Sequence, residues 1–210
     1  MKKILIIGAG AMGSAFAVPC VDNKNDVTIV GTHLENDLIE KIKSNDQIHP
    51  TLKTKLSSEV KFQKFEKLQT ILDQDLDIIV CGVSSIGIEW FVKQISKKYK
   101  KGIPIILLTK GLSILDDELT TLSDKIRTLL NKDGHSEINI SAIKGPCLAA
   151  GLANKMRTGT IIANQKVKEA QLLKGIISTN YYSTEISEDI NGVELSGAIK
   201  NIYSMLIGAS

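Results

Sequence analysis

A glycine cluster placed directly after a short aliphatic run is the first feature of this sequence that could do chemistry. Residues 4–7 are aliphatic and are followed by Gly8, Gly10 and Gly13 in the pattern Gly-x-Gly-x-x-Gly. Between a strand and a helix, these glycines permit a tight turn, close approach of a pyrophosphate and close helix packing, in that order. An anion would be favoured by the amides at the helix start, which belong to Ala11, Met12 and Gly13. The pattern predicts a dinucleotide site, although a glycine turn without a ligand would look the same.

The end of the second predicted strand bears on which dinucleotide binds. Dinucleotide sites usually have an acid here for the ribose 2′-hydroxyl, or a basic residue for a 2′-phosphate. Residues 27–30 are instead followed by Gly31, Thr32 and His33. Thr32 and His33 can donate hydrogen bonds to a phosphate and no acid stands at the strand tip to repel one, so NADP is favoured over NAD. For His33, an ordinary surface loop position explains the sequence equally well.

Two lysines follow later predicted strands, where ligands of open α/β sheets bind. Lys110 lies in Thr-Lys-Gly at 109–111, and Lys144 precedes Gly-Pro-Cys at 145–147. An ammonium at a strand tip could face a phosphorylated or carboxylated substrate. We favour a ligand contact for Lys110 and a solvated side chain for Lys144. A third lysine, Lys200, lies in an amphipathic segment near the end, and spacing alone gives no reason to single it out.

The elements that position these residues alternate between short apolar runs and longer amphipathic stretches. Strands are predicted over residues 3–7, 27–30, 60–62, 78–81, 103–108, 138–142, 160–163 and 181–185. Helices are predicted over residues 12–21, 35–43, 64–72, 87–99, 116–130, 148–154 and 167–177. This order predicts an α/β fold, a Rossmann-like, doubly wound and mostly parallel sheet. Residues 190–210 form one further long helical stretch with no strand after it.

Composition excludes several classes of protein. The chain has 210 residues, of which 43% are hydrophobic, 23% charged and 4% aromatic, as in an aliphatic globular protein. Its net charge of +3 is too small for a nucleic-acid footprint. Cys20, Cys81 and Cys147 are far apart, which predicts reduced thiols in the cytoplasm and neither disulfides nor a metal site.

The N-terminus has the outline of a secretory signal. Two lysines precede an uncharged run over residues 4–21. A glycine cluster in the middle of this run disfavours a helix that inserts into a membrane. We therefore favour a buried strand, turn and helix and expect no membrane insertion.

Four motifs together resemble one family. GAGAMG at 8–13, TKG at 109–111, GPC at 145–147 and GVELSGAIKN at 192–201 are similar to the NAD(P)-dependent glycerol-3-phosphate dehydrogenases of bacteria and archaea. The resemblance runs over essentially the whole chain. It implies interconversion of sn-glycerol 3-phosphate and dihydroxyacetone phosphate with NAD or NADP, for glycerophospholipid synthesis in the cytoplasm. A homodimer is left open.

The resemblance also assigns roles. It implies that Lys200 is the general base, that Lys110 contacts both cofactor and substrate, and that Ala149 approaches the cofactor. Further substrate contacts are implied for Gly145, Cys147 and Asn201. A lysine amine is ordinarily a poor base at neutral pH, so burial or a neighbouring cation must lower its pKa, and Lys110 is the candidate for that cation.

Some positions depart from the family. Ala11 and Met12 stand where many bacterial members have Ser-Trp, Thr32 where they have arginine, and Cys147 where they have serine. Family members also continue into a helical substrate domain beyond the Lys200-Asn201 motif. We therefore expect a dinucleotide-binding domain over residues 1–189 and the truncated start of the substrate domain over residues 190–210. A catalytically silent NAD(P)-binding fragment and a related hydroxy-acid dehydrogenase are the alternatives.

Overall fold

An eight-stranded sheet forms the centre of the molecule. The structure is a computed structural model that describes residues 1–208, without the side chains of residues 201–204 and 206. Within that part of the chain, the strand order is β12-β11-β10-β7-β6-β1-β2-β5. The strands are β1 (Lys3–Ile7), β2 (Asp26–Val30), β5 (Lys61–Gln63), β6 (Ile78–Cys81), β7 (Ile105–Leu107), β10 (Ile140–Lys144), β11 (Thr158–Ala163) and β12 (Tyr182–Ser187). All eight predicted strands are confirmed within a few residues.

The pairing of the strands is mostly parallel, as predicted. Only β10 and β11 run antiparallel to each other within this sheet, as far as the structure describes the chain. The order reverses between β1 and β6, because the chain first adds β2 and β5 on one side of β1 and then crosses to the other side. Such a reversal leaves a crevice at the carboxyl ends of the two strands, where open α/β sheets bind ligands.

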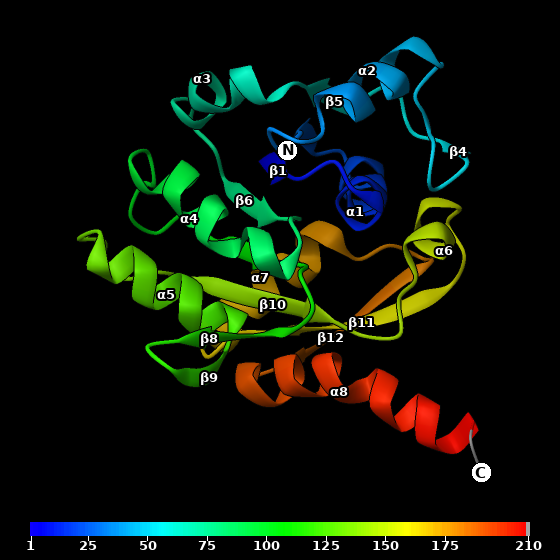
Figure 1. Cartoon of the computed structure of the whole chain (residues 1–210). Helices are drawn as coiled ribbons and strands as arrows, with labels where there is room; N and C mark the ends of the chain where they lie inside the picture. The colour runs from blue at the N-terminus through cyan, green and yellow to red at the C-terminus, as the bar shows by residue number, and fades with distance from the viewer. Residues whose placement is uncertain (209–210) are drawn as a thin grey trace.

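Helices cover both faces of the sheet (Figure 1). They are α1 (Ala11–Asp22), α2 (Asn36–Ser44), α3 (Leu68–Leu72), α4 (Ile88–Ser96), α5 (Leu122–Lys132), α6 (Ala149–Ala153), α7 (Val167–Ile177) and α8 (Ile190–Gly208). In β1, Ile4 and Ile6 join the core under α1, α2 and α7, whereas Leu5 and Ile7 join the core under α3, α4 and α5. Successive side chains of a strand point to opposite faces of the sheet. Because both sets are apolar in β1, both faces of the sheet must be covered by helices. None of the described helices is long and apolar enough to cross a membrane.

One predicted helix begins too early. The helix expected over residues 116–130 starts only with α5, and the preceding residues form the hairpin of β8 (Leu112–Leu115) and β9 (Glu118–Thr121). Asp116 and Asp117 both have positive φ, 51° and 64°, as the type I′ turn of a two-residue hairpin requires. The prediction was wrong because aspartate tolerates this left-handed conformation, and the turn separates two short strands that pair.

A second hairpin, β3 (Ile48–His49) with β4 (Thr54–Lys55), was not predicted. Its strands are two residues long, which is too short for alternation to be visible in the sequence.

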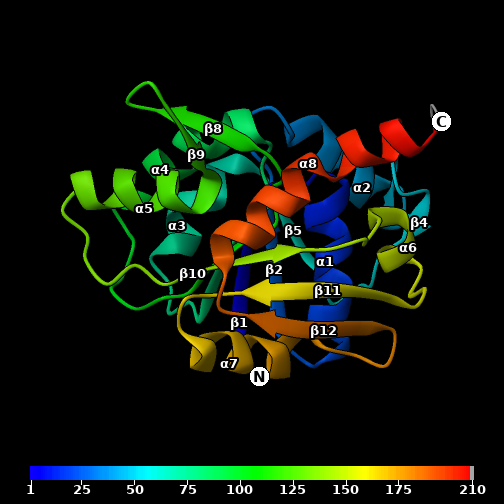
Figure 2. The ribbon, with the colours of Figure 1, turned by 90° about the horizontal axis from the view of Figure 1, so that it is seen from below.

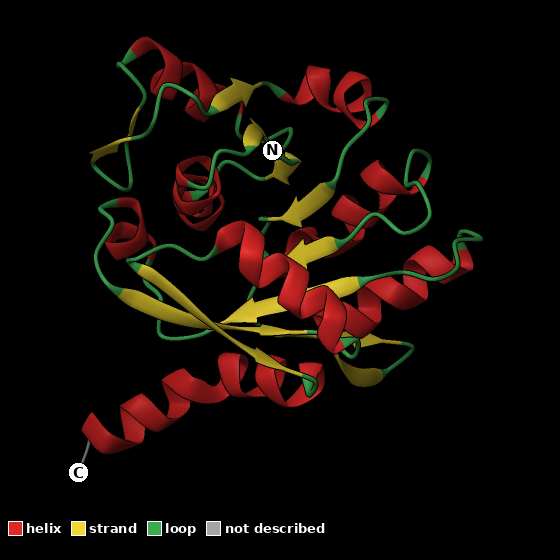
Figure 3. Ribbon diagram, turned by 180° about the vertical axis from the view of Figure 1, so that it is seen from behind, coloured by secondary structure: helices red, strands yellow, loops and turns green. Residues whose placement is uncertain are grey.

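The last helix, α8, crosses β10 and β11 (Figure 2) on the face opposite to the one that α7 covers. Ile190 shares a small apolar core with Ala142 of β10 and Ala163 of β11. A Cβ on Gly197 would lie 3.3 Å from Cγ of Lys144, so α8 and β10 approach closely there. Figure 3 shows α8 continuing beyond the sheet toward its C-terminal end.

Candidate dinucleotide and substrate site

A hollow of about 420 Å³ lies at the carboxyl ends of β1, β6 and β7. Its wall contains three chain segments, each of which directly follows a strand: Gly10, Ala11 and Met12; Gly82, Val83, Ser84 and Ser85; and Leu108, Thr109 and Lys110. This is the crevice where the strand order reverses. The structure therefore brings together the glycine motif and Lys110, which are about a hundred residues apart in the sequence.

The glycine turn is built around close backbone approaches. Gly8 has φ +111°, and a Cβ there would lie 2.7 Å from the carbonyl carbon of Gly82. A Cβ on Gly13 would lie 2.3 Å from the carbonyl oxygen of Gly8. Gly10 differs, because its nearest neighbour for a Cβ is a side-chain oxygen of Glu35 at 3.7 Å. The turn is thus packed tightly at its first and third glycines and open at its second, as a pyrophosphate cradle requires.

Glu35 is a residue of this region that the sequence did not indicate. Its Oε2 atom accepts hydrogen bonds from the amides of Ala9, at 3.0 Å, and Thr32, at 2.7 Å. The side chain thereby links the glycine turn to the loop after β2. The expectation that no acid lies near Thr32 is wrong, because Glu35 precedes α2 and its side chain reaches back to the end of the strand.

His33 belongs to an aromatic cluster at the same edge of the sheet. Its ring lies 5.3 Å from that of Trp90 in α4 and 6.1 Å from that of Phe65, as centroid distances. The rings of Phe65 and Trp90 are 5.7 Å apart. His33 itself is exposed, so the cluster presents an aromatic surface beside the loop after β2.

A second hollow, of about 430 Å³, lies between α8 and the ends of β10 and β11. Its lining includes Lys144, Gly145, Ser196 and Lys200. The side chain of Lys110 connects the two hollows, since its Nζ donates a hydrogen bond to the Gly145 carbonyl at 3.4 Å. Burial and the positive charge of Lys200 lower the pKa of Lys110. The three lysines thus lie in one neighbourhood, although they come from three different segments.

The remaining predicted site residues are Cys147, Ala149 and Asn201. Cys147 is buried, and burial raises the pKa of its thiol. Ala149 begins α6 and packs against the apolar core. The side chain of Asn201 lies outside the described residues.

Lys144 is buried, with only 3% of its surface exposed, so the expected solvated side chain is wrong. Its ammonium donates hydrogen bonds to the carbonyls of Leu107, at 3.1 Å, and Thr109, at 2.7 Å. Burial lowers the pKa of Lys144 to about 8, although attraction to Glu194 opposes this. Glu194 of α8 is fully buried and accepts a hydrogen bond from the amide of Ser123 at 3.2 Å. Burial raises the pKa of Glu194. Only the tertiary structure reveals this connection between β10, the end of β7 and α8.

The buried amine gives a test by pH. Up to about pH 8 Lys144 is charged in the folded and unfolded chain, and its burial destabilises the fold in full. Between about 8 and its ordinary 10.5 the folded chain releases the proton first, so the free energy of unfolding rises with pH. Lys144→Met lacks this rise. Urea unfolding of both proteins should show the wild type gaining about 3 kcal/mol relative to the variant across this range. Parallel pH profiles would contradict burial of a titrating amine.

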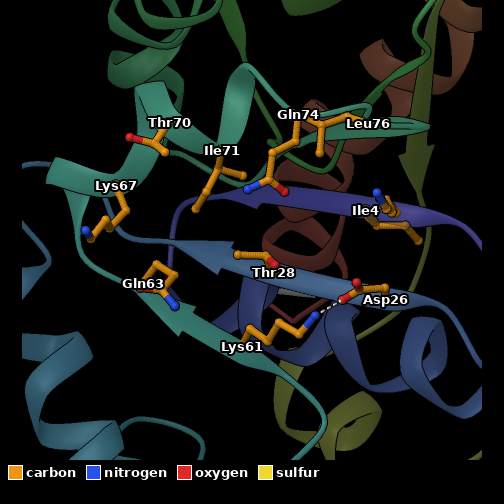
Figure 4. A pocket seen from close by; sticks show the side chains of 11 residues that line it. Ile4, Asp26, Thr28, Lys61, Gln63, Lys67, Thr70, Ile71, Gln74 and Leu76 are labelled. Atoms are coloured by element: carbon orange, nitrogen blue, oxygen red, sulfur yellow. Dashed lines mark hydrogen bonds and ion pairs between the residues drawn. The ribbon is translucent and has the colours of Figure 1, made fainter.

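A further hollow lies between α3 and the strands β1, β2 and β5 (Figure 4). Its volume is about 320 Å³, and its polar lining includes Thr28, Gln63 and Gln74. Lys61 and Asp26 form an ion pair there, with 2.6 Å between Nζ and Oδ1. It shares no lining residue with the crevice at the carboxyl ends of β1 and β6 and is distinct from it.

Comparison with known proteins gives a consistent result. The family model described as the NAD-dependent glycerol-3-phosphate dehydrogenase N-terminus matches residues 3–170. The NADP(+)-dependent glycerol-3-phosphate dehydrogenase of Archaeoglobus fulgidus is 34% identical over 204 residues, which are 97% of this chain and 59% of that protein. Glycerol-3-phosphate dehydrogenase [NAD(P)+] of Mesoplasma florum is 30% identical over 214 residues, with the same coverage of 97% and 59%. The chain thus spans 59% of the length of these two relatives.

Solved structures show the same fold. A glycerol-3-phosphate dehydrogenase from Coxiella burnetii superposes with a TM-score of 0.81 at 21% identity, covering 97% of this chain and 59% of the other. The corresponding Plasmodium falciparum structure gives 0.83 at 21% identity, covering 97% and 57%. At this level of identity, the superpositions show a shared architecture.

Proposed function

Because this chain belongs to the NAD-dependent glycerol-3-phosphate dehydrogenase family, we propose that it binds NAD or NADP in the crevice between β1 and β6. The observation that carries the proposal is the glycine turn, which is tightly packed at Gly8 and Gly13 and open at Gly10. The pyrophosphate would be held by the amides at the start of α1, among them those of Ala11 and Met12. The adenosine end would lie toward Thr32 and the aromatic surface of His33.

The reaction we propose for the full-length protein interconverts sn-glycerol 3-phosphate and dihydroxyacetone phosphate. The bound dinucleotide supplies the hydride acceptor. Lys200 would take the proton of the C2 hydroxyl, and Lys110 would contact substrate and cofactor together. The effect of the Lys200 charge on the pKa of Lys110 supports this assignment, because two residues that act on one substrate must lie close together. The backbone of Gly145 and Cys147 and the side chain of Asn201 would complete the substrate contacts, and Ala149 would approach the cofactor.

The domain boundary is also a proposal. Residues 1–189 would form the dinucleotide-binding domain, and residues 190–210 the first helix of an α-helical substrate domain. The close packing of Gly197 against Lys144 supports a role for α8 in joining the two.

A second candidate function is a dinucleotide-binding unit that does not turn over substrate by itself. It is favoured by the coverage of only 59% of the A. fulgidus and M. florum relatives. A hydroxy-acid substrate is a further alternative. Turnover assays of this chain and of the full-length protein, with glycerol 3-phosphate and with hydroxy acids, distinguish the three.

Dinucleotide binding itself can be measured through Trp90, the one tryptophan of the chain. Its place in the aromatic cluster near the proposed adenosine site predicts that NADH and NADPH quench its emission and gain sensitised emission themselves. We expect one dinucleotide per chain by calorimetry. Trp90→Phe is the control, because it removes the optical signal while calorimetric binding persists. Absence of heat with both dinucleotides would contradict the proposal.

Three further expectations accompany the function. The cysteines Cys20, Cys81 and Cys147 are buried free thiols, which supports a reducing compartment such as the cytoplasm. A role in glycerophospholipid synthesis is proposed from the resemblance to the family. A homodimer stays a prediction, which sedimentation would test.

A further inference from the structure

His49 lies fully buried beside the glycine turn, far from the motif in sequence. Its Nε2 atom is 3.0 Å from the carbonyl oxygen of Ala9. Its Nδ1 atom accepts hydrogen bonds from the amides of Thr51, at 3.2 Å, and Leu52, at 3.3 Å. A nitrogen that accepts carries no proton, so the ring proton is on Nε2 and is donated to Ala9. One neutral imidazole therefore joins the β3–β4 hairpin to the turn.

The backbone groups of Ala9 are held on both sides. Its carbonyl also accepts a hydrogen bond from the Ser14 hydroxyl at 2.9 Å, and its amide donates to Glu35 at 3.0 Å. Ala9 is itself fully buried. Since Ala9 stands between Gly8 and Gly10, these three side chains fix the part of the turn that a ligand would otherwise have to order on binding.

We propose that His49 is a positioning residue for dinucleotide binding. By holding the Ala9 carbonyl, it keeps Gly10 and the amides at the start of α1 in the arrangement that a pyrophosphate needs. That the ligand is a dinucleotide depends on the function proposed above. The hydrogen bond from His49 to the Ala9 carbonyl is a property of the chain without any ligand. Ordering the turn before binding reduces the entropic cost of binding, so loss of the hydrogen bond from His49 to Ala9 should lower the affinity for the dinucleotide.

Two substitutions test the roles of the two ring nitrogens of His49 separately. In His49→Gln the amide nitrogen takes the place of Nε2 and can still donate to Ala9. In His49→Asn the shorter amide takes the place of Nδ1, so it can accept the hairpin amides but does not reach Ala9. We expect His49→Gln to keep the dissociation constant for NADH or NADPH within about twofold and His49→Asn to raise it about tenfold, the effect of one well-placed hydrogen bond.

Hydrogen exchange of the dinucleotide-free chain tests, without a ligand, whether the hydrogen bond from His49 orders the glycine turn. Exchange in residues 8–14 should be faster in His49→Asn than in the wild type and nearly unchanged in His49→Gln. If the wild type bound neither NADH nor NADPH, the proposed function would fail, yet exchange would still decide whether His49 orders the turn. If His49→Asn and His49→Gln showed the same exchange rates over residues 8–14 and the same dinucleotide affinity, the proposed role of His49 would be overturned.

Ser14→Ala provides a second approach if His49→Asn does not fold. It removes the other donor to the Ala9 carbonyl and leaves the β3–β4 hairpin untouched. Faster exchange over residues 8–14 and weaker dinucleotide binding are expected. Unchanged exchange and affinity would show that hydrogen bonds to this carbonyl do not position the turn, which overturns the proposal.

Discussion

Replacing Lys200 with alanine is expected to lower kcat for glycerol 3-phosphate in the full-length protein by about a thousandfold. The reason is that no other group would take the C2 hydroxyl proton as the hydride leaves. Affinity for the dinucleotide should persist, because the crevice between β1 and β6 is formed without Lys200. Steady-state kinetics with calorimetry of the same preparation measures both quantities.

Lys200→Arg separates the base from the charge. Arginine keeps a cation at this position but stays protonated, so it cannot accept the proton, and turnover should remain as low as in the alanine variant. Lys168→Ala is the matched control, since Lys168 is an exposed lysine of α7, on the other side of the sheet. Full activity of Lys200→Arg would show that Lys200 acts through its charge.

The second large effect is expected at Gly13. In Gly13→Ala the new methyl would lie 2.3 Å from the carbonyl oxygen of Gly8, a backbone atom that cannot move without displacing β1 or α1. Overpacking of this kind costs about 1–3 kcal/mol, and the rigid neighbours place Gly13→Ala toward the upper end. Thermal unfolding should show the loss of stability, and calorimetry should show no dinucleotide binding.

Gly10→Ala is the matched comparison within the same motif. Gly10 has φ −61°, which alanine adopts freely, and its new methyl would lie 3.7 Å from the nearest atom, in Glu35. We therefore expect stability close to that of the wild type together with at least tenfold weaker binding, because the methyl faces the approaching pyrophosphate. Equal stability losses in the two variants would contradict the assignment of packing to Gly13 and ligand approach to Gly10.

Much of the architecture was predictable from local patterns. Buried strands such as β6, and β1 after Lys3, are apolar without interruption, and their burial on both faces leaves the same signature in the sequence. The glycine motif was predictable for the same reason, since close backbone contact excludes any side chain at Gly8 and Gly13. The β8–β9 hairpin was missed because its aspartate turn resembles a helix start.

The residues that support the site were not predictable. Glu35 and His49 both bind backbone atoms of Ala9, and such contacts depend on how distant loops meet at the sheet edge. Lys144 shows the same limit, because its position at a strand tip is compatible with solvent or burial. Only the packing of α8 over β10 decides between them.

The α/β fold, the position of the glycine turn and the family were therefore predictable from the residues, since each of them depends on local apolar patterns or short motifs. By contrast, the proximity of Lys110, Lys144 and Lys200 and the hydrogen bonds from Glu35 and His49 to the glycine turn became visible only in the folded chain. The physical reason is that side-chain hydrogen bonds and repulsion between charges act over a few ångströms in space, and residues far apart in sequence carry no local pattern that reports such proximity.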